Sequence, residues 1–235
     1  MTEELFRSDA YLRSCAARIV EADAFGVRLD RTVFYPEGGG QPGDTGTLTG
    51  AGGTLKVVDT RKHPATGEPV HVIEAGAILP APGDAVTATL DWERRYRHMR
   101  MHTCLHLLCS LVIGAVTGGA LNETKGRLDF DLPDTALDRD SLTAGLNRLV
   151  AGDHEVLARW IADAELEATP DLVRTMSVKP PMGTGRVRLL DIAGIDLQPC
   201  GGTHVLRTGE IGSVVIGKIE NKGRHNRRVN IAFAA

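Results

Sequence analysis

Two short motifs that lie far apart in the sequence place the tightest constraint on the fold of this chain. The first holds His102 and His106, and the second holds Cys200 and His204, each pair four residues apart. On a helix this spacing places both side chains of a pair on one face, one turn apart. Together the pairs offer three imidazoles and one thiolate, a donor set that suits tetrahedral Zn²⁺ better than Mg²⁺ or Ca²⁺. The sequence therefore predicts a fold that brings both motifs to one zinc ion.

A third histidine leaves a choice of ligands at the first motif. His98 precedes His102 by the same interval that separates His102 from His106. The segment before His102 is basic, whereas the segment after His106 is apolar. A metal site that admits a substrate lies where a wet groove meets a packed helix, and this favours His102 and His106. We expect His98 to support the site or to face RNA.

Residues 1–91 have the pattern of a small β-barrel or sandwich. A glycine-rich loop runs from Phe34 to Gly46, without the Gly-Lys-Ser/Thr or GxGxxG patterns of ATP and dinucleotide sites. It is as compatible with a structural turn as with a loop laid over a substrate. Short alternating or β-branched stretches, separated by Gly, Pro and Asp clusters, occur at 26–34, 54–60, 70–73 and 85–90.

From residue 92 onward the pattern predicts an α+β domain with helices packed on an antiparallel sheet. A long helix is expected over 93–116, ended by glycines, and a second over 138–151. Prolines and glycines between 170 and 185 predict an irregular crossing. Strands are expected at 125–131, 155–165 and 186–192, and a hairpin at 213–220 and 228–233. The predicted fold is thus α+β, with a barrel domain at 1–91 and a zinc-binding domain at 92–235.

Charge and targeting signals restrict the partners of the chain. The net charge is −3, so any contact with nucleic acid must come from a local patch. Residues 205–235 hold six basic and two acidic residues, which suits such a patch but also a merely solvated basic end. No targeting or membrane-spanning segment is visible, and four irregularly spaced cysteines do not form a disulfide framework. We expect a cytoplasmic protein with no membrane association.

The residues beside the predicted zinc site disfavour two familiar classes of hydrolase. A zincin helix carries Glu directly after its first histidine, where this chain has Thr103. The deaminase signature fails too, because no Cys-x-x-Cys partners the histidine and no Glu stands two residues after His102. The roles that remain for zinc are those of a Lewis acid, a substrate anchor or an activator of water. An activated ester suits such a site because it is easier to hydrolyse than an amide.

Four segments carry a resemblance to a known family. They are the loop from Phe34 to Gly46, His102-Thr-Cys-Leu-His106-Leu-Leu, Cys200-Gly-Gly-Thr-His204 and the basic stretch from Lys218 to Arg228. In this order they resemble the freestanding alanyl-tRNA editing proteins, the AlaX family, which are similar to the editing domain of alanyl-tRNA synthetase. The glycine-rich N-terminal domain resembles the medium-length class. Nothing resembles the aminoacylation core and the chain begins with Met1, so we expect a self-standing editor.

The resemblance implies hydrolysis of the ester that joins a wrong amino acid to tRNA(Ala), chiefly serine, with glycine as a second candidate. It implies that His102, His106, Cys200 and His204 bind one Zn²⁺ per chain. Four simultaneous ligands would close the coordination shell, so one ligand has to be weak or the ion has to expand its shell. The general base stays unassigned.

Candidate substrate contacts follow from the same expectation. A site that hydrogen-bonds a hydroxyl rejects the analogue without it, and Thr32 is the candidate for this contact with serine, or else an ordinary strand threonine. Gln41 and Gln198 are candidates for contacts to the substrate or the terminal adenosine. Contacts to acceptor-stem phosphates are expected from Arg94, Arg95, Arg97, Lys222, Arg224, Arg227 and Arg228.

Two other functions stay open at this point. In one, the zinc is structural and the chain is an RNA-binding module without activity. In the other, the chain is a zinc hydrolase of small esters. The expected partner is mischarged tRNA(Ala), and a monomer is favoured.

Overall fold

The computed structural model describes residues 1–132, 137–169, 172–173 and 185–234. The chain divides into two compact units, Met1–Tyr96 and Arg97–Ala235, and each is described by itself. Most of the irregular crossing expected between 170 and 185 lies outside the described residues. The domain boundary expected between residues 91 and 92 stays a prediction.

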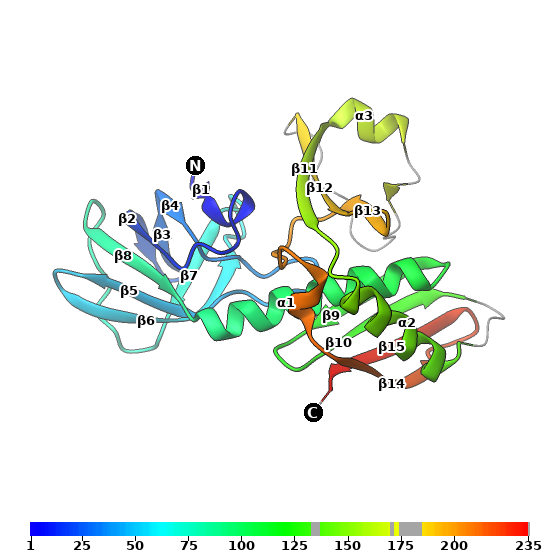
Figure 1. Cartoon of the computed structure of the whole chain (residues 1–235). Helices are drawn as coiled ribbons and strands as arrows, with labels where there is room; N and C mark the ends of the chain where they lie inside the picture. Colours follow the sequence, from blue (N-terminus) through cyan, green and yellow to red (C-terminus); the bar gives the residue numbers. More distant parts are fainter. Residues whose placement is uncertain (133–136, 170–171, 174–184, 235) are drawn as a thin grey trace. The chain divides into compact units, whose positions relative to one another are not determined.

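A closed barrel forms the centre of the first unit, with strand order β2-β3-β7-β6-β5-β8 (Figure 1). Closure leaves no unpaired edge, and side chains alternate between the interior and the solvent. The strands are β2 (Ser14–Asp23), β3 (Gly26–Leu29), β5 (Gly46–Gly50), β6 (Gly53–Lys62), β7 (Pro69–Ile73) and β8 (Ala85–Leu90). The predicted barrel is confirmed, although β2 and β5 were not among the expected strands.

The interior of the barrel is filled by aliphatic side chains and one aromatic ring. Leu29, Phe34 and Leu48 have no exposed surface and pack in one cluster with Ile19 and Val57. Outside the barrel, the short strand β1 (Glu3–Glu4) is followed by the 3₁₀ turn η1 (Leu5–Arg7) and pairs in parallel with β4 (Arg31–Thr32).

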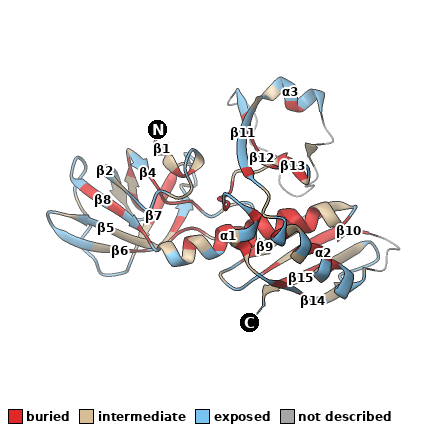
Figure 2. Cartoon of the chain, viewed as in Figure 1, coloured by how far each residue is buried: buried red, intermediate tan, exposed pale blue. Residues whose placement is uncertain are grey.

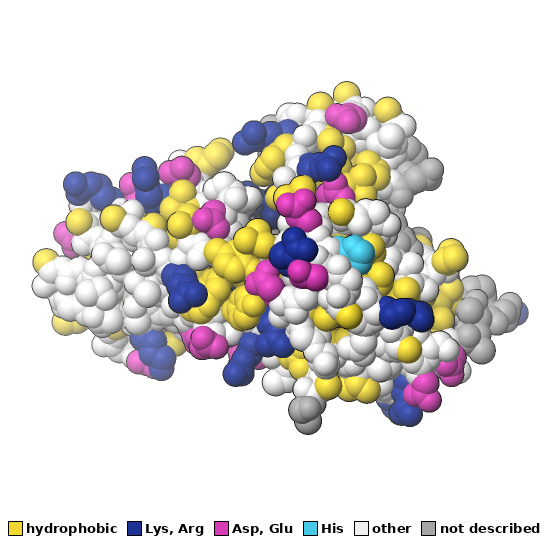
Figure 3. Space-filling view, in the orientation of Figure 1, with side chains coloured by type: hydrophobic (Ala, Val, Ile, Leu, Met, Phe, Trp, Pro, Cys, Tyr) yellow, Lys and Arg dark blue, Asp and Glu magenta, His cyan; other side chains and the backbone are white. Residues whose placement is uncertain are grey.

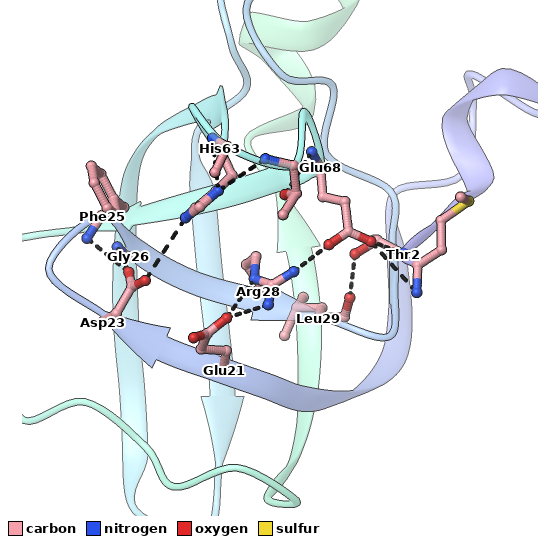
Figure 4. Close-up of polar contacts among 12 residues, drawn as sticks. Thr2, Glu21, Asp23, Phe25, Gly26, Arg28, Leu29, His63 and Glu68 are labelled. Atoms are coloured by element: carbon pink, nitrogen blue, oxygen red, sulfur yellow. Dashed lines mark hydrogen bonds and ion pairs between the residues drawn. The ribbon is translucent and has the colours of Figure 1, made fainter. Parts of the chain in front are cut away.

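Arg28 anchors the N-terminus to this barrel (Figure 4). Its guanidinium donates to Glu21 on β2 and to Glu68, which directly precedes β7. Glu68 also accepts from the amide of Thr2 at 2.9 Å, and the Thr2 hydroxyl donates to the carbonyl of Leu29 at 2.7 Å. These contacts tie three separate segments of the first unit together.

The glycine-rich loop is shaped in part by close packing. A Cβ atom at Gly43 would lie 1.9 Å from the carbonyl oxygen of Thr60, and one at Gly46 would lie 2.1 Å from that of Thr89. Only glycine allows these approaches. Gly39 differs, because it has a φ of +58° and open space around it. The second half of the loop therefore has a structural role, which the sequence alone left undecided.

Helix α1 (Trp92–Leu111) begins in the first unit, where Arg95 fixes its first turn. The Arg95 side chain is fully buried, and its Nε donates to the Asp44 carboxylate at 3.0 and 3.1 Å. Its terminal nitrogens donate to the carbonyls of Ala10 and Val33. A buried cation is tolerated only when paired in this way, and loss of one partner typically costs about 3–5 kcal/mol.

The second unit contains a four-stranded antiparallel sheet of order β14-β15-β10-β9. Its strands are β9 (Ala115–Leu121), β10 (Lys125–Asp131), β14 (Val214–Asn221) and β15 (Asn226–Phe233). The long helix α1 packs closely on it, since a Cβ atom at Gly126 on β10 would lie 3.0 Å from Met101 Sδ. Buried residues accordingly follow α1 and the strands beside it (Figure 2).

Helix α2 (Arg139–Ala151) covers the β14 end of this sheet. The Asp138 carboxylate caps the helix by accepting from the amide of Ser141 at 2.7 Å. Asn147 then pairs with both backbone groups of Val214, donating at 2.8 Å and accepting at 3.0 Å. These two bonds hold the helix on the strand.

A second, three-stranded antiparallel sheet has the order β11-β12-β13. It consists of β11 (Val156–Ala162), β12 (Arg186–Ile192) and β13 (Asp196–Pro199). Helix α3 (Asp163–Ala168) packs Leu166 against Val187 and Leu189 on one face of this sheet. Helices on antiparallel sheets confirm the predicted α+β class.

Some element boundaries differ from those expected. The first helix ends at Leu111, and residues 115–121 form a strand, because Val116 and Thr117 are β-branched and Gly118 and Gly119 fit the close pairing with β10. The expected strand at 155–165 turns into helix α3 at Asp163. Strand β13 was not expected. The C-terminal hairpin and the strands at 125–131 and 186–192 are confirmed. No helix in the described ranges is long and apolar enough to cross a bilayer.

Candidate metal centre

The two motifs meet in the second unit as one group of four donors. His102 and His106 lie on α1, and Cys200 and His204 lie in the segment that follows β13. One ligand atom from each residue lies within 4.8 Å of the others. Cys200 Sγ is 3.7 Å from His102 Nε2 and 3.2 Å from His204 Nε2. Zinc bonds of about 2.0–2.3 Å in a tetrahedron imply ligand separations of roughly 3.5 Å, so the group could hold one such ion.

The histidines of the group are buried, Cys200 is partly buried, and the electrostatics favour a thiolate on Cys200. The three histidines are exposed by 8% or less. Burial opposes ionisation of the Cys200 thiol, but the imidazoles of His102, His204 and His106 outweigh it and hold its pKa well below the ordinary value. Burial also disfavours a charged His106, yet the Cys200 thiolate and the Asp196 carboxylate raise the pKa of His106 to about 9. Without a metal ion the centre thus favours a Cys200 thiolate, the form in which cysteine binds metal, next to a His106 cation, which has to release its Nε2 proton when a metal ion binds.

Thr103 fixes the orientation of His204. Its hydroxyl donates to the carbonyl of Met99 at 2.9 Å, so its oxygen can only accept from Nδ1–H of His204, 3.2 Å away. The same oxygen accepts from the amide of Val205 at 3.3 Å. Since Nδ1 carries the proton, Nε2 presents its lone pair to the centre. Thr103 thus occupies the position of the zincin glutamate, and its role here is to select the Nδ1-protonated tautomer of His204.

Asp196 fixes His106 in the same way. Nδ1 of His106 lies 2.9 Å from the Asp196 carboxylate, which leaves Nε2 for the centre. The Gln198 side-chain amide donates to the same carboxylate oxygen at 2.6 Å. Asp196 was missed from the sequence. The only available signal was its position two residues before Gln198, which puts both on one face of a strand.

Arg188 supports the second motif from β12. Its guanidinium donates to the carbonyls of Cys200 at 2.8 Å and Gly202 at 3.1 Å, while the amide of Cys200 donates to the Arg188 carbonyl at 3.1 Å. These bonds hold the backbone that carries Cys200. Arg188 was also missed, because nothing in the sequence separates it from the other arginines. His98 is fully buried and outside the donor group, so the expectation that it faces RNA is wrong and a supporting role remains.

Two of the expected substrate residues lie in the first unit. Thr32 is fully buried, and its hydroxyl contacts Nε2 of His71 at 2.8 Å and accepts from the amide of Phe34 at 3.0 Å. Nδ1 of His71 is bound to the carbonyl of Val27 at 2.9 Å and so carries the ring proton. Thr32 therefore donates to His71 and keeps one acceptor lone pair. Gln41 is fully buried in the glycine-rich loop, where its backbone pairs with Gly38.

The basic residues expected to bind tRNA have different surroundings. Arg97 is exposed, Arg94 donates to the carbonyl of Gly43, and Arg95 is enclosed as described above. A fully buried arginine cannot reach a phosphate, so the structure corrects that expectation for Arg95 and gives it a structural role.

The basic turn between β14 and β15 is more open. Lys222 and Arg224 are exposed, and Lys222 forms an ion pair with Glu220 at 3.0 Å. Arg228 instead donates to Asp129 on β10 at 2.7 and 2.9 Å, and Arg227 bonds backbone carbonyls within the turn. On the face drawn in Figure 3, Lys and Arg side chains are interspersed with Asp and Glu.

Comparison with known proteins adds independent information. Residues 10–94 match the model of class II (A) tRNA synthetases, and residues 187–230 match that of the threonyl and alanyl tRNA synthetase second additional domain. The chain is 40% identical over 244 residues to the alanyl-tRNA editing protein AlaX-M of Methanosarcina acetivorans, covering 97% of this chain and 98% of the relative. The chain belongs to the AlaX family of alanyl-tRNA editing proteins. The resemblance inferred from four sequence segments is thereby confirmed.

Other relatives show where AlaX and synthetase sequences overlap. AlaX-M of Saccharolobus solfataricus is 36% identical over 235 residues, covering 97% of this chain and 98% of the relative. The alanine–tRNA ligase of Pyrobaculum neutrophilum is 39% identical over 233 residues, but the match covers 25% of that ligase. The chain therefore matches an AlaX-M protein over nearly its whole length, whereas it matches one part of a ligase.

Proposed function

We propose that this chain is a zinc-dependent deacylase of mischarged tRNA(Ala), acting chiefly on Ser-tRNA(Ala) and secondarily on Gly-tRNA(Ala). The observation that carries the proposal is the group of four metal-ligand side chains formed by His102, His106, Cys200 and His204. It is supported by the printed names of relatives that match the chain over nearly its whole length.

The residues of the chain prepare the site for one Zn²⁺. When bound, zinc supplies a Lewis acid that can hold a polar group of the substrate and lower the pKa of water. Asp196 and Thr103 keep protons on Nδ1 of His106 and His204, so both rings present Nε2 without rearrangement. Arg188 holds the backbone of Cys200. The site is thus ordered by neutral and charged hydrogen bonds from three separate elements.

Recognition of the amino acid is assigned to Thr32, with Gln41 as a further candidate. The remaining lone pair of Thr32 can accept from the hydroxyl of serine, which alanine lacks. Because Thr32 is fully buried, this contact requires its side chain to become exposed when the substrate binds. Gln198 donates to Asp196, so we now assign it to support of His106 rather than to the substrate. For tRNA phosphates we retain Arg94, Arg97, Lys222, Arg224 and Arg227, with the exposed Arg97, Lys222 and Arg224 as the principal contacts. Arg228 is not retained, because its guanidinium is bound to Asp129.

The decisive experiment measures the release of serine from Ser-tRNA(Ala) and of alanine from Ala-tRNA(Ala), before and after zinc removal by a chelator. Serine should be released quickly, alanine retained, and activity restored by added zinc. His106→Asn should remain folded and lose turnover, whereas unfolding of that variant would favour a purely structural zinc. Failure of folded, zinc-loaded protein to release either amino acid would refute the proposal. Equal activity on esters without tRNA would favour a hydrolase of small esters.

A further inference from the structure

Trp160 lies on one face of the β11-β12-β13 sheet, and the residues that hold the metal ligands in place project from the same face. Strand β11 is one of the two edge strands of this sheet (Figure 1), and Trp160 pairs with Arg188 on β12. On the neighbouring pair of strands, Gln198 is opposite Leu190 and Asp196 is opposite Ile192. Paired residues share a face and the face alternates along each strand. Trp160, Arg188, Gln198 and Asp196 therefore all project from one face.

The indole ring is accessible, which is unusual for a large aromatic side chain. Trp160 is 41% exposed, and its neighbours on the same face of β11 are Ala158 and Ala162, both small and exposed. The apolar core beneath α3 belongs to the opposite face of the sheet, which includes Val187 and Leu189. Packing of that core thus gives no reason for a tryptophan at position 160.

A positive charge accompanies the ring. The guanidinium of Arg186 lies over the indole, 4.5 Å from the ring centroid. Arginine planes and aromatic rings are the two groups on which proteins stack unpaired bases, and the arginine also attracts phosphate. Such stacking contributes about 1–3 kcal/mol per base and does not depend on base identity.

One residue, Arg188, connects Trp160 to the backbone of the metal centre. This cross-strand partner of Trp160 donates directly to the carbonyl of Cys200 at 2.8 Å. In an aminoacyl-tRNA the reacting ester is on the ribose of the last nucleotide, so the terminal base must lie within one nucleotide of the site of hydrolysis. A stacking group beside Arg188 is at a suitable position to bind that base.

We propose that Trp160 and Arg186 form a stacking platform for the unpaired 3′-terminal nucleotides of the tRNA substrate. This platform rests on the proposed function and extends it to a binding site on β11. Trp160 is a positioning residue in this proposal, because it binds the base next to the ester and does not contact the ester itself.

The test is a binding measurement that needs no turnover. The chain contains two tryptophans, so a Trp92→Phe background leaves Trp160 as the only indole reporter. The probe is an RNA minihelix with an unpaired 3′ end, compared with the same minihelix cut back to a blunt end. The unpaired probe should quench Trp160 fluorescence, and the blunt probe should not.

Variants then measure the contribution of the ring, using a labelled minihelix. Trp160→Ala should weaken binding of the unpaired minihelix between about 5-fold and 150-fold and leave the blunt one unchanged. Trp160→Phe should retain most of the affinity. The matched control is Leu157→Ala, since Leu157 is on the same strand, 39% exposed and on the opposite face of the sheet. Circular dichroism and zinc content should be the same in all variants.

Two results would overturn the platform. One is unchanged affinity of Trp160→Ala for the unpaired minihelix, and the other is an equal loss of affinity for both probes. In deacylation assays the same variant should raise KM with little change in kcat. A wild-type protein that binds the unpaired end but releases no serine would refute the proposed function while leaving the platform intact, so the two failures are distinguishable.

Discussion

Nδ1 of His204 lies 3.2 Å from the hydroxyl oxygen of Thr103, and this contact turns the opposite ring nitrogen toward Cys200. Removal of the hydroxyl by Thr103→Val should therefore lower zinc affinity about 10- to 100-fold, the usual effect of losing a residue that orients a ligand. Competition with a chromophoric chelator measures this affinity. Thr103→Ser retains the hydroxyl and is the control. Wild-type zinc affinity in folded Thr103→Val would contradict the assigned role.

Asp196→Asn tests the support of His106. The change keeps the shape of the side chain but removes its charge, so we expect zinc affinity to fall about 10- to 100-fold. Gln198→Ala should cause a smaller loss of zinc affinity and leave KM for Ser-tRNA(Ala) unchanged, because Gln198 acts on Asp196. A raised KM with normal zinc affinity would instead return Gln198 to the substrate contacts.

The buried His71 should make the first unit sensitive to acid. Burial lowers the pKa of His71 to about 4, against an ordinary 6.5. Below about pH 6.5 the unfolded chain takes up a proton that the folded chain binds only near pH 4. As far as His71 is concerned, the free energy of unfolding therefore has its full value above pH 6.5. It should decrease by about 3 kcal/mol as the pH falls to 4.

Urea unfolding monitored by Trp92 fluorescence in Trp160→Phe protein measures the stability of the first unit at each pH. His71→Gln cannot titrate and should lose this part of the pH dependence. If the two proteins weaken in parallel on acidification, His71 is not the responsible group.

The basic turn offers a matched pair of arginines. Arg224 is exposed, whereas Arg228 is occupied by Asp129. Arg224→Ala should weaken tRNA binding and reduce the slope of log affinity against log salt by about 1, because one phosphate contact is lost. Arg228→Ala should leave that slope almost unchanged. Titrations of labelled tRNA at several salt concentrations measure both, and equal slopes for Arg224→Ala and wild type would exclude Arg224 as a contact.

The parts of the structure that were predictable from sequence are those in which residue type itself limits the environment. Histidine and cysteine at metal-ligand spacing indicate a shared site, so the grouping of His102, His106, Cys200 and His204 could be predicted from the sequence. Strand alternation likewise indicated the barrel, as in the inward-facing Val86, Ala88 and Leu90 of β8.

Residues that act through a partner were not predictable. Thr103, Asp196 and Arg188 are common residue types, and their roles arise from contacts across long stretches of chain. Arg95 was misassigned for the same reason, because its partner Asp44 is 51 positions earlier. Strand β9 was not predicted, because Gly118 and Gly119 were interpreted as the end of a helix. In the structure both glycines lie within the strand, where they allow close pairing with β10.

The donor group joins the two ends of a long stretch of the second unit, since Cys200 and His102 are 98 positions apart. Helix α1 supplies one half of the group and the segment after β13 the other, so no single element contains the site. It can be completed only after the polypeptide between the two motifs has folded back. Uptake of a metal ion by the complete donor group would then follow the folding of this stretch and would be a late event in maturation.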